Sequence, residues 1–188
     1  MYHNINEQEL ARLCMEKDRR AEDELYTRYA ARLLTLTRRY CQDPDDAMDL
    51  MQDAIIKALE RISTYSYTGK GSLYAWISRI AVNMALNHIN RYRNRMISLE
   101  IFSREQIPEP EEPQETDMEL VPEQEILRMI SGLTQMQRVI FNMFCIDGYS
   151  HKEISKMLFI SEKGSASLLA KARRRLKKEI NEYLKKTH

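Results

Sequence analysis

The stretch from Ser98 to Glu125 is the feature that most limits how this chain can fold. It contains four of the five prolines and ten carboxylates against a single basic residue. Proline lacks a backbone N–H and like charges repel each other, so such a stretch cannot form a helical core. We therefore expect two separate domains, residues 1–97 and 124–188, joined by an acidic, flexible, Pro-rich linker at residues 98–123.

Both flanking parts are predicted to be helical. Glycine and proline are scarce, while Leu, Met, Ala, Lys, Arg and Glu are common, and apolar residues recur at helical spacing. The first part is expected to hold helices at residues 6–16, 21–41, about 44–63 and 72–95. The second is expected to hold helices within residues 123–133, 134–148, 150–158 and 161–184. The predicted fold class is all-α, with two small helical domains.

Local signals place several helix ends. Asp43 and Pro44 are typical of an N-cap followed by the first helical position. Gly148 is a C-terminal stop, and Ser150 with Glu153 forms the pattern of a capping box. Only the three residues 159–161 separate the last two helices, which is typical of a helix-turn-helix.

The small net charge of +1 hides a strong partition along the chain. Residues 1–97 carry +2, residues 98–125 carry −9, and residues 126–188 carry +8. A basic segment of this size indicates a polyanionic partner for the second domain.

Several protein classes are disfavoured. The three cysteines are far apart, no apolar run is long enough to span a membrane, and no basic-then-apolar leader begins the chain, so a cytoplasmic, soluble protein is expected. A phosphate loop at TGKGS fails, since Thr64 and Gly71 occupy positions that need Gly and Ser or Thr. We expect a chain that is not an enzyme and that binds no cofactor and no metal.

The helix after residue 161 separates into two faces at 100° per residue. Ser165, Leu169, Ala172 and Leu176 form one stripe, which is expected to be buried. The other face carries Lys163, Ser167, Ala170, Lys171 and Arg174. A basic helix end is also a common solvated feature. Together with the capping box, the short turn and the +8 charge, it favours DNA contact.

The first domain offers two further surfaces. Asp49, Gln52, Asp53 and Ile56 share one face of the third helix, which indicates a basic protein partner or a merely solvated face. In the following loop and helix, aromatic residues adjoin cations, a composition suited to stacking on unpaired bases. Trp76 also fits a core stripe. The candidate residues are Tyr65, Tyr67, Lys70, Trp76, Arg79, Asn83, Asn87, Arg91 and Arg93.

Two segments carry a family resemblance. RYCQDPDDAMDLMQDAIIKALERI with GKGSLYAWISRIAVNMALNHINR resembles region 2, and LTQMQRVIFNMF with GYSHKEISKMLFIS resembles region 4, of extracytoplasmic-function (ECF) sigma factors of bacterial RNA polymerase. The two segments occur in the family's order, with a linker between them.

The resemblance implies roles for these residues. Asp49, Gln52, Asp53 and Ile56 would dock on the β′ clamp helices of core polymerase, and the second domain would meet the β flap. The loop and fourth helix would engage the −10 element and capture a flipped base, with Asn83 and Asn87 near base edges and Arg91 and Arg93 on phosphates. The −35 element would be contacted by Lys163, Gly164, Ser165, Ser167, Lys171 and Arg174.

The last helix departs from the family pattern S-E-G-T-V-K-S-R-L. Ala166 and Leu168 stand where that pattern has basic residues, and Ser165 stands for its buried valine. Gly164 lies near the third helical position, where a missing side chain would let backbone approach phosphate. Shape and phosphate contacts are therefore expected to carry more of the −35 recognition.

Three alternatives stay open at this point. The linker is either a solubilising spacer or an RNA mimic near the transcript path. The whole chain could be a stand-alone helix-turn-helix regulator, or an interaction protein that lost DNA binding.

The resemblance also implies an anti-sigma partner, possibly membrane-anchored, with no membrane insertion by this chain.

Overall fold

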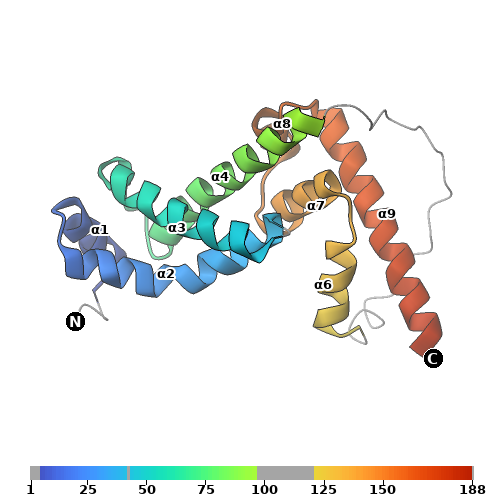
Figure 1. The fold of residues 1–188 in the computed structure, drawn as a ribbon, viewed down its shortest axis with the longest axis horizontal. Coiled ribbons are helices and arrows are strands. Elements are labelled where there is room, and N and C mark those ends of the chain that lie inside the picture. The colour runs from blue at the N-terminus through green and yellow to red at the C-terminus, as the bar shows by residue number, and fades with distance from the viewer. Residues whose placement is uncertain (1–4, 42, 97–120, 188) are drawn as a thin grey trace. The chain divides into compact units, whose positions relative to one another are not determined.

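The computed structural model describes residues 5–41, 43–96 and 121–187, with side chains described for all of these except 90–96 and 187. Every regular element in these ranges is helical, which confirms the all-α fold class (Figure 1). The chain divides into two compact units, residues 1–95 and 96–188. The predicted linker at 98–123 falls largely outside the described residues.

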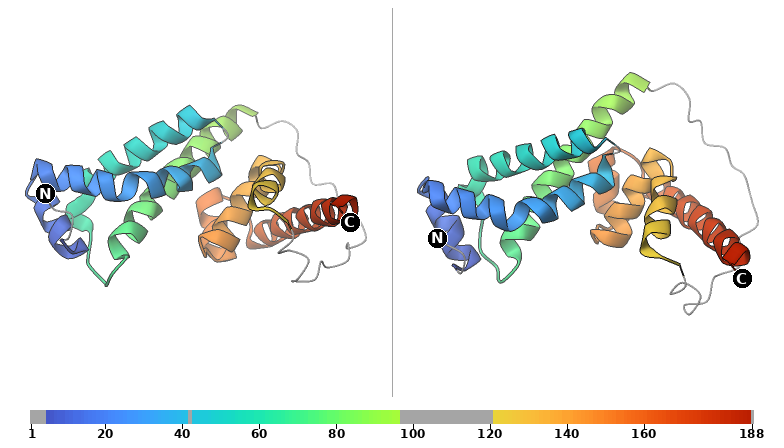
Figure 2. Two further views of the ribbon diagram at one scale, coloured as in Figure 1. Left: turned by 90° about the horizontal axis from the view of Figure 1, so that it is seen from below. Right: turned by 60° about the horizontal axis from the view of Figure 1, so that its bottom comes forward.

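The first unit contains α1 (Glu7–Met15), α2 (Arg19–Tyr40), α3 (Pro44–Arg61), the 3₁₀ turn η1 (Ile62–Thr64) and α4 (Ser72–Met96). A short turn after α2 reverses the chain, so that α2 and α3 lie side by side and antiparallel in both Figure 1 and Figure 2. Asp43 caps α3 as predicted, because its Oδ1 accepts from the N–H of Asp45 at 2.8 Å.

The core of this unit is built from one face of each helix. α2 contributes Leu25 and Leu33, α3 contributes Met51 and Ile55, and α4 contributes Ile77, all at most 4% exposed. Burying apolar side chains of this size supplies about 1.5–3 kcal/mol each relative to exposure. The predicted apolar spacing is thus what joins the helices.

The second unit contains α6 (Glu123–Ser131), α7 (Gln135–Phe141), a π-helical continuation η2 (Asn142–Ile146), α8 (His151–Leu158) and α9 (Glu162–Thr187). Thr134 and Gln137 form a capping box at the start of α7. The helices α6, α7 and α8 all pack against α9.

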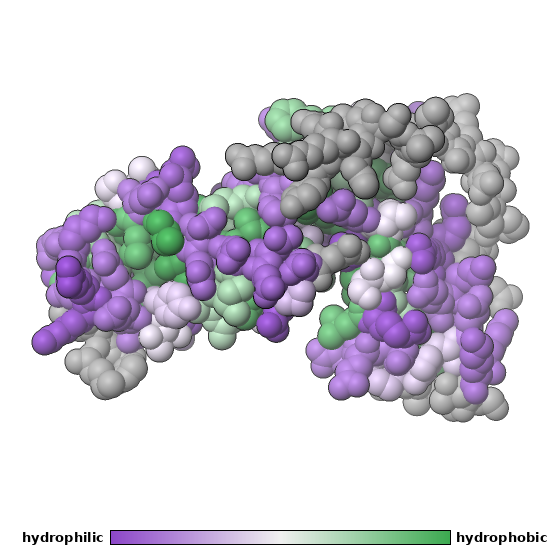
Figure 3. All heavy atoms as spheres, viewed as in Figure 1, coloured by the Kyte–Doolittle hydropathy of each residue, from purple (hydrophilic) through white to green (hydrophobic). Residues whose placement is uncertain are grey.

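The core of the second unit follows the length of α9. Met129 and Leu133 pack with Ala172, Leu176 and Ile180 of α9. The outward side of α9 is hydrophilic over most of its length in the view of Figure 3. Across the described parts of the chain, no helix is both long enough and apolar enough to cross a membrane.

Candidate polymerase and promoter interfaces

One face of α3 is exposed and acidic. Its opposite side is buried through Ala47, Leu50, Met51, Ala54, Ile55 and Ala58. The four residues predicted on the free side, Asp49, Gln52, Asp53 and Ile56, are all exposed, and Ile56 is 55% exposed. We call these four residues the acidic face. An apolar side chain among carboxylates suits a protein partner whose surface has an apolar spot among cations.

Glu60 lies one turn beyond the acidic face and is paired within the helix. Its Oε2 lies 2.6 Å from Nζ of Lys57, and this hydrogen bond lowers the pKa of Glu60. Because Lys57 offsets the charge of Glu60, the negative charge of the acidic face comes from Asp49 and Asp53.

The loop of residues 65–71 is folded onto the start of α4. The ring of Tyr65 lies 5.6 Å from that of Trp76, and its hydroxyl lies 2.6 Å from Oγ of Ser72. Burial raises the pKa of Tyr65. Trp76 is half-buried against Tyr65, so Tyr67, 42% exposed, and Lys70 are the predicted loop residues most open to a ligand.

The first turn of α4 is capped by a side chain from α1. Glu7 Oε2 accepts from the backbone N–H of Gly71 at 2.8 Å and of Leu73 at 3.2 Å. Its Oε1 accepts from the hydroxyl of Tyr29 at 2.9 Å. The sequence prediction missed Glu7, because no local pattern joins residues that are more than sixty positions apart.

The outward face of α4 continues from this loop. Arg79, Asn83 and Asn87 are all exposed and follow one another at four-residue spacing, so they share one side of the helix. Arg91 and Arg93 belong to the last turns of α4, and their side chains lie outside the described residues. The structure thus groups three of the predicted polar residues in one row.

The helix-turn-helix has the geometry predicted for it. The Ser150–Glu153 capping box is present, with Ser150 N–H donating to Glu153 Oε2 at 2.9 Å. α8 ends at Leu158, and Phe159, Ile160 and Ser161 make the three-residue turn. Phe159 adopts the left-handed conformation, with φ 55° and ψ 45°, and is 83% exposed.

The buried stripe of α9 is confirmed. Ser165, Leu169, Ala172 and Leu176 are each at most 9% exposed. The prediction that Ser165 also contacts DNA is wrong for its side chain, which is fully buried. Its Oγ lies 2.9 Å from Nδ1 of His151, whose ring stacks on Phe144 at 4.5 Å. At position 165, where the family pattern has a buried valine, a hydrogen bond therefore joins α9 to α8.

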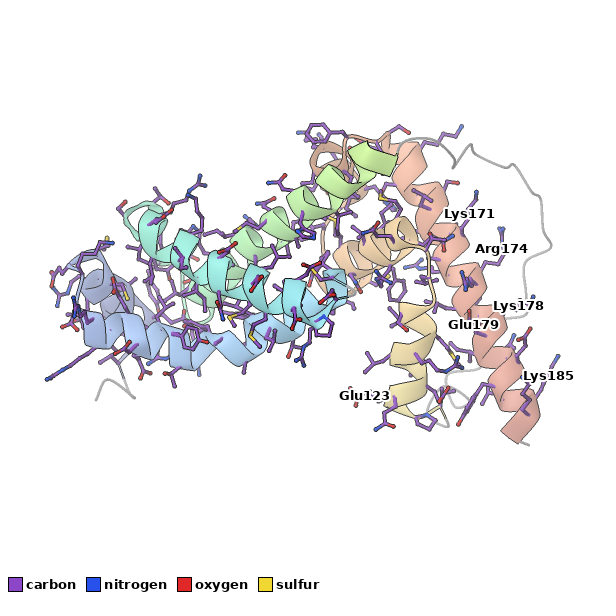
Figure 4. All side chains as sticks on the ribbon, in the orientation of Figure 1. Glu123, Lys171, Arg174, Lys178, Glu179 and Lys185 are labelled. Carbon is purple, nitrogen blue, oxygen red and sulfur yellow. The ribbon has the colours of Figure 1, made fainter. Side chains whose placement is uncertain are left out.

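The exposed side of α9 carries the other predicted −35 residues. Lys163 and Ser167 are exposed, and Lys171 and Arg174 are half-exposed. Figure 4 shows Lys171, Arg174, Lys178 and Lys185 spaced along α9 toward its C-terminal end. This basic row supplies several cations for a phosphate backbone.

Gly164 has a different environment from the one expected. It occupies the third position of α9, as predicted, but its N–H donates to Oγ of Ser161 at 2.9 Å. A Cβ at this position would lie 3.1 Å from the same Oγ. Ser161 is thus a local cap, and the amide of Gly164 is already used within the turn.

Comparisons with known proteins agree with this organisation. The family described as sigma-70 region 2 matches residues 25–95, and the family described as sigma-70 region 4 matches residues 123–176. The chain is 26% identical over 166 residues to the ECF RNA polymerase sigma-E factor of Escherichia coli, covering 84% of this chain and 85% of that protein.

Two further comparisons cover different extents. The match to the RNA polymerase sigma-H factor of Pseudomonas aeruginosa is 35% identical over 83 residues, 44% of this chain, and spans only 42% of that protein. The sigma factor RpoE of Bartonella quintana, solved in complex with the anti-sigma factor NepR, has a similar fold, with a TM-score of 0.52 and 18% identity over 85% of this chain and 96% of that one.

A region 2 match in the first helical unit, followed by a region 4 match in the second, is the organisation of a two-domain transcription initiation factor. The chain belongs to the sigma-70 family, in its ECF group. Sigma factors are non-enzymatic initiation factors, so the family assignment also makes this chain a non-enzymatic protein.

Proposed function

We propose that this chain binds core RNA polymerase and directs it to promoters by recognising −10 and −35 elements, helping to open the DNA for initiation. The observation that carries the proposal is the pairing of an exposed acidic face on α3 with a basic helix-turn-helix in the same chain. The stand-alone regulator is not favoured, because a region 2 match precedes the region 4 match.

Each surface has a separate part in this proposal. The acidic face docks on the β′ clamp helices, and the second unit meets the β flap. Tyr67, Lys70 and the row of Arg79, Asn83 and Asn87 act on the −10 element, where unstacked bases can be held by aromatic and polar groups. Lys163, Ser167, Lys171 and Arg174 act on the −35 element, mainly through phosphates.

The proposal includes an anti-sigma partner and a cytoplasmic location. The Bartonella protein of similar fold was solved with an anti-sigma factor. A regulator of this kind, free or membrane-anchored, would compete for the surfaces that polymerase and DNA use. The cytoplasmic location follows from the polymerase partner, because the chain must be where polymerase is.

Co-purification with core polymerase and run-off transcription test the proposal. Transcripts sequenced after overexpression supply the promoter, through alignment of their upstream DNA. Initiation that requires both this chain and core polymerase is the expected result. A chain that binds an operator as a symmetric dimer without polymerase would overturn the proposal.

The docking surface is tested by Asp53→Lys. Placing a like charge against a basic partner costs several kcal/mol, so we expect holoenzyme affinity to fall at least about thirtyfold, or about 2 kcal/mol. Asp53 is exposed, so the fold should be unchanged. Asp23→Lys makes the same charge change at an exposed residue of α2 and should leave affinity within about twofold. Normal assembly by Asp53→Lys would remove the acidic face from the interface.

A further inference from the structure

Glu7 joins three helices of the first unit through one carboxylate. Its two oxygens accept from Gly71 and Leu73 at the start of α4 and from Tyr29 of α2. Glu7 itself belongs to α1, which precedes the segment 25–95 that the region 2 family matches. The helix that supplies this contact therefore lies outside the segment that the region 2 family matches.

The carboxylate of Glu7 accepts hydrogen bonds from backbone N–H groups at the start of α4 that have no acceptor within the helix. The first N–H groups of a helix have no partner within the helix, and a negative charge there is favoured by the helix dipole. Ser72, the first residue of α4, has its hydroxyl engaged with the hydroxyl of Tyr65. Gly71 has φ +90°, a conformation that glycine adopts easily and that lets its N–H donate to the carboxylate of Glu7.

The loop and α1 also share a surface. A hollow of about 350 Å³ is lined by Asn6, Gln8, Glu9, Ala11, Arg12 and Met15 on one side and by Tyr65 and Tyr67 on the other. The start of α1 is held in turn by α2, since Arg28 donates to the carbonyl oxygen of Ile5 at 3.0 Å. Tyr67 therefore lies across this hollow from α1.

We propose that Glu7 is a positioning residue for the loop of residues 65–71, and that α1 is a working part of the unit that recognises the −10 element. The inference rests on the proposed function of that loop. Without the carboxylate, the amides of Gly71 and Leu73 lose their acceptor and the loop occupies its present conformation for a smaller fraction of the time. Apparent affinity for an unpaired base falls by that fraction.

The structural half is tested by amide hydrogen exchange on the full-length protein without any ligand. In Glu7→Ala, protection at Gly71 and Leu73 should fall at least tenfold, as expected when hydrogen bonds to a charged acceptor are lost. Glu7→Gln keeps an acceptor oxygen in place and should remain within about threefold. Glu16→Ala, which removes an exposed partner of Arg12 at the other end of α1, should change neither amide.

The functional half is measured with holoenzyme on the promoter identified from transcripts. Permanganate reactivity of unpaired thymines should show about tenfold less promoter opening with Glu7→Ala, near-normal opening with Glu7→Gln, and unchanged opening with Glu16→Ala. Holoenzyme assembly should stay within twofold of wild type for all three, because the acidic face lies on α3.

The possible results are distinguishable. Unchanged exchange at Gly71 and Leu73, or unchanged opening despite faster exchange, overturns the role of Glu7. Loss of assembly or a large fall in melting temperature with Glu7→Ala would also overturn it, because Glu7 would then be structural. A wild-type chain that assembles with polymerase but opens no promoter overturns the proposed function itself, whatever the exchange data show.

Discussion

Replacing Phe159 by glycine should make the second unit more stable. Phe159 ends α8 with φ 55°, in the left-handed region, where a residue with a Cβ costs about 1–2 kcal/mol. Helices commonly end with glycine at such a position. Because the side chain is 83% exposed, removing the ring forfeits little buried apolar surface.

The magnitude follows from two opposing terms. Relief of backbone strain stabilises the folded state by about 1–2 kcal/mol. The greater conformational freedom of glycine stabilises the unfolded chain by about 0.5–1 kcal/mol, which offsets part of this gain. The net gain is about 0.5–1 kcal/mol, which for a domain of this size raises the melting temperature by roughly 2–8 °C. Phe159→Ala keeps the Cβ and removes the same ring, so it should stay within about 0.5 kcal/mol of wild type.

Calorimetry of the full-length protein measures both variants. The transition of the second unit can be identified as the one lowered by Leu176→Ala, because Leu176 belongs to that core. Gly148 provides the reciprocal test. It has φ +76° with no atom within 4 Å of an added Cβ, so Gly148→Ala should cost about 1 kcal/mol through backbone conformation alone. A glycine variant at position 159 no more stable than the alanine variant would refute the strain argument.

Three other outcomes follow from single residues. Asp43→Ala removes the side-chain cap of α3 and should lower the free energy of unfolding of the first unit by about 1 kcal/mol in urea titration. Burial raises the pKa of the Cys14 thiol from 9.0 to about 11, so the stability that this thiol contributes is complete below pH 9 and is lost as pH rises toward 11. Mass spectrometry after iodoacetamide treatment at pH 8 should accordingly show exposed Cys145 modified and Cys14 protected until the protein unfolds. Lys163→Ala should weaken −35 DNA binding about equally for all sequences and reduce the slope of log affinity against log salt by about 1.

The features that could be predicted from the sequence are those whose partners are close along the chain. The Asp43 cap and the Ser150–Glu153 capping box join residues two or three positions apart, and the structure has both. The buried stripe of α9 follows from the helical period alone. The exposed acidic face of α3 was found by the same argument, because its opposite side had to be the core.

The features that were missed depend on tertiary contacts. Glu7 reaches residues 64 and 66 positions away, and His151 meets Ser165 across two helices. No rule of spacing distinguishes Glu7 from Glu9, the other carboxylate of α1. Phe159 stands at a left-handed helix end where glycine is usual. The short turn could therefore be predicted from the sequence, but the left-handed conformation of Phe159 could not.

Under the proposed function, the same contacts limit which groups of α9 could contact DNA. The side chain of Ser165 is buried, and the backbone N–H of Gly164 already donates to Oγ of Ser161. The small residues in the first turn of α9 therefore offer fewer backbone groups to a phosphate than their size suggests. Ala166, on the exposed side, has no hydrogen-bonding side chain for a base edge. The groups left on this face are Ser167 and the cations Lys163, Lys171 and Arg174, which act best on phosphates. If the proposed function holds, sequence preference at the −35 element must come largely from the shape and deformability of the DNA that brings phosphates to these side chains.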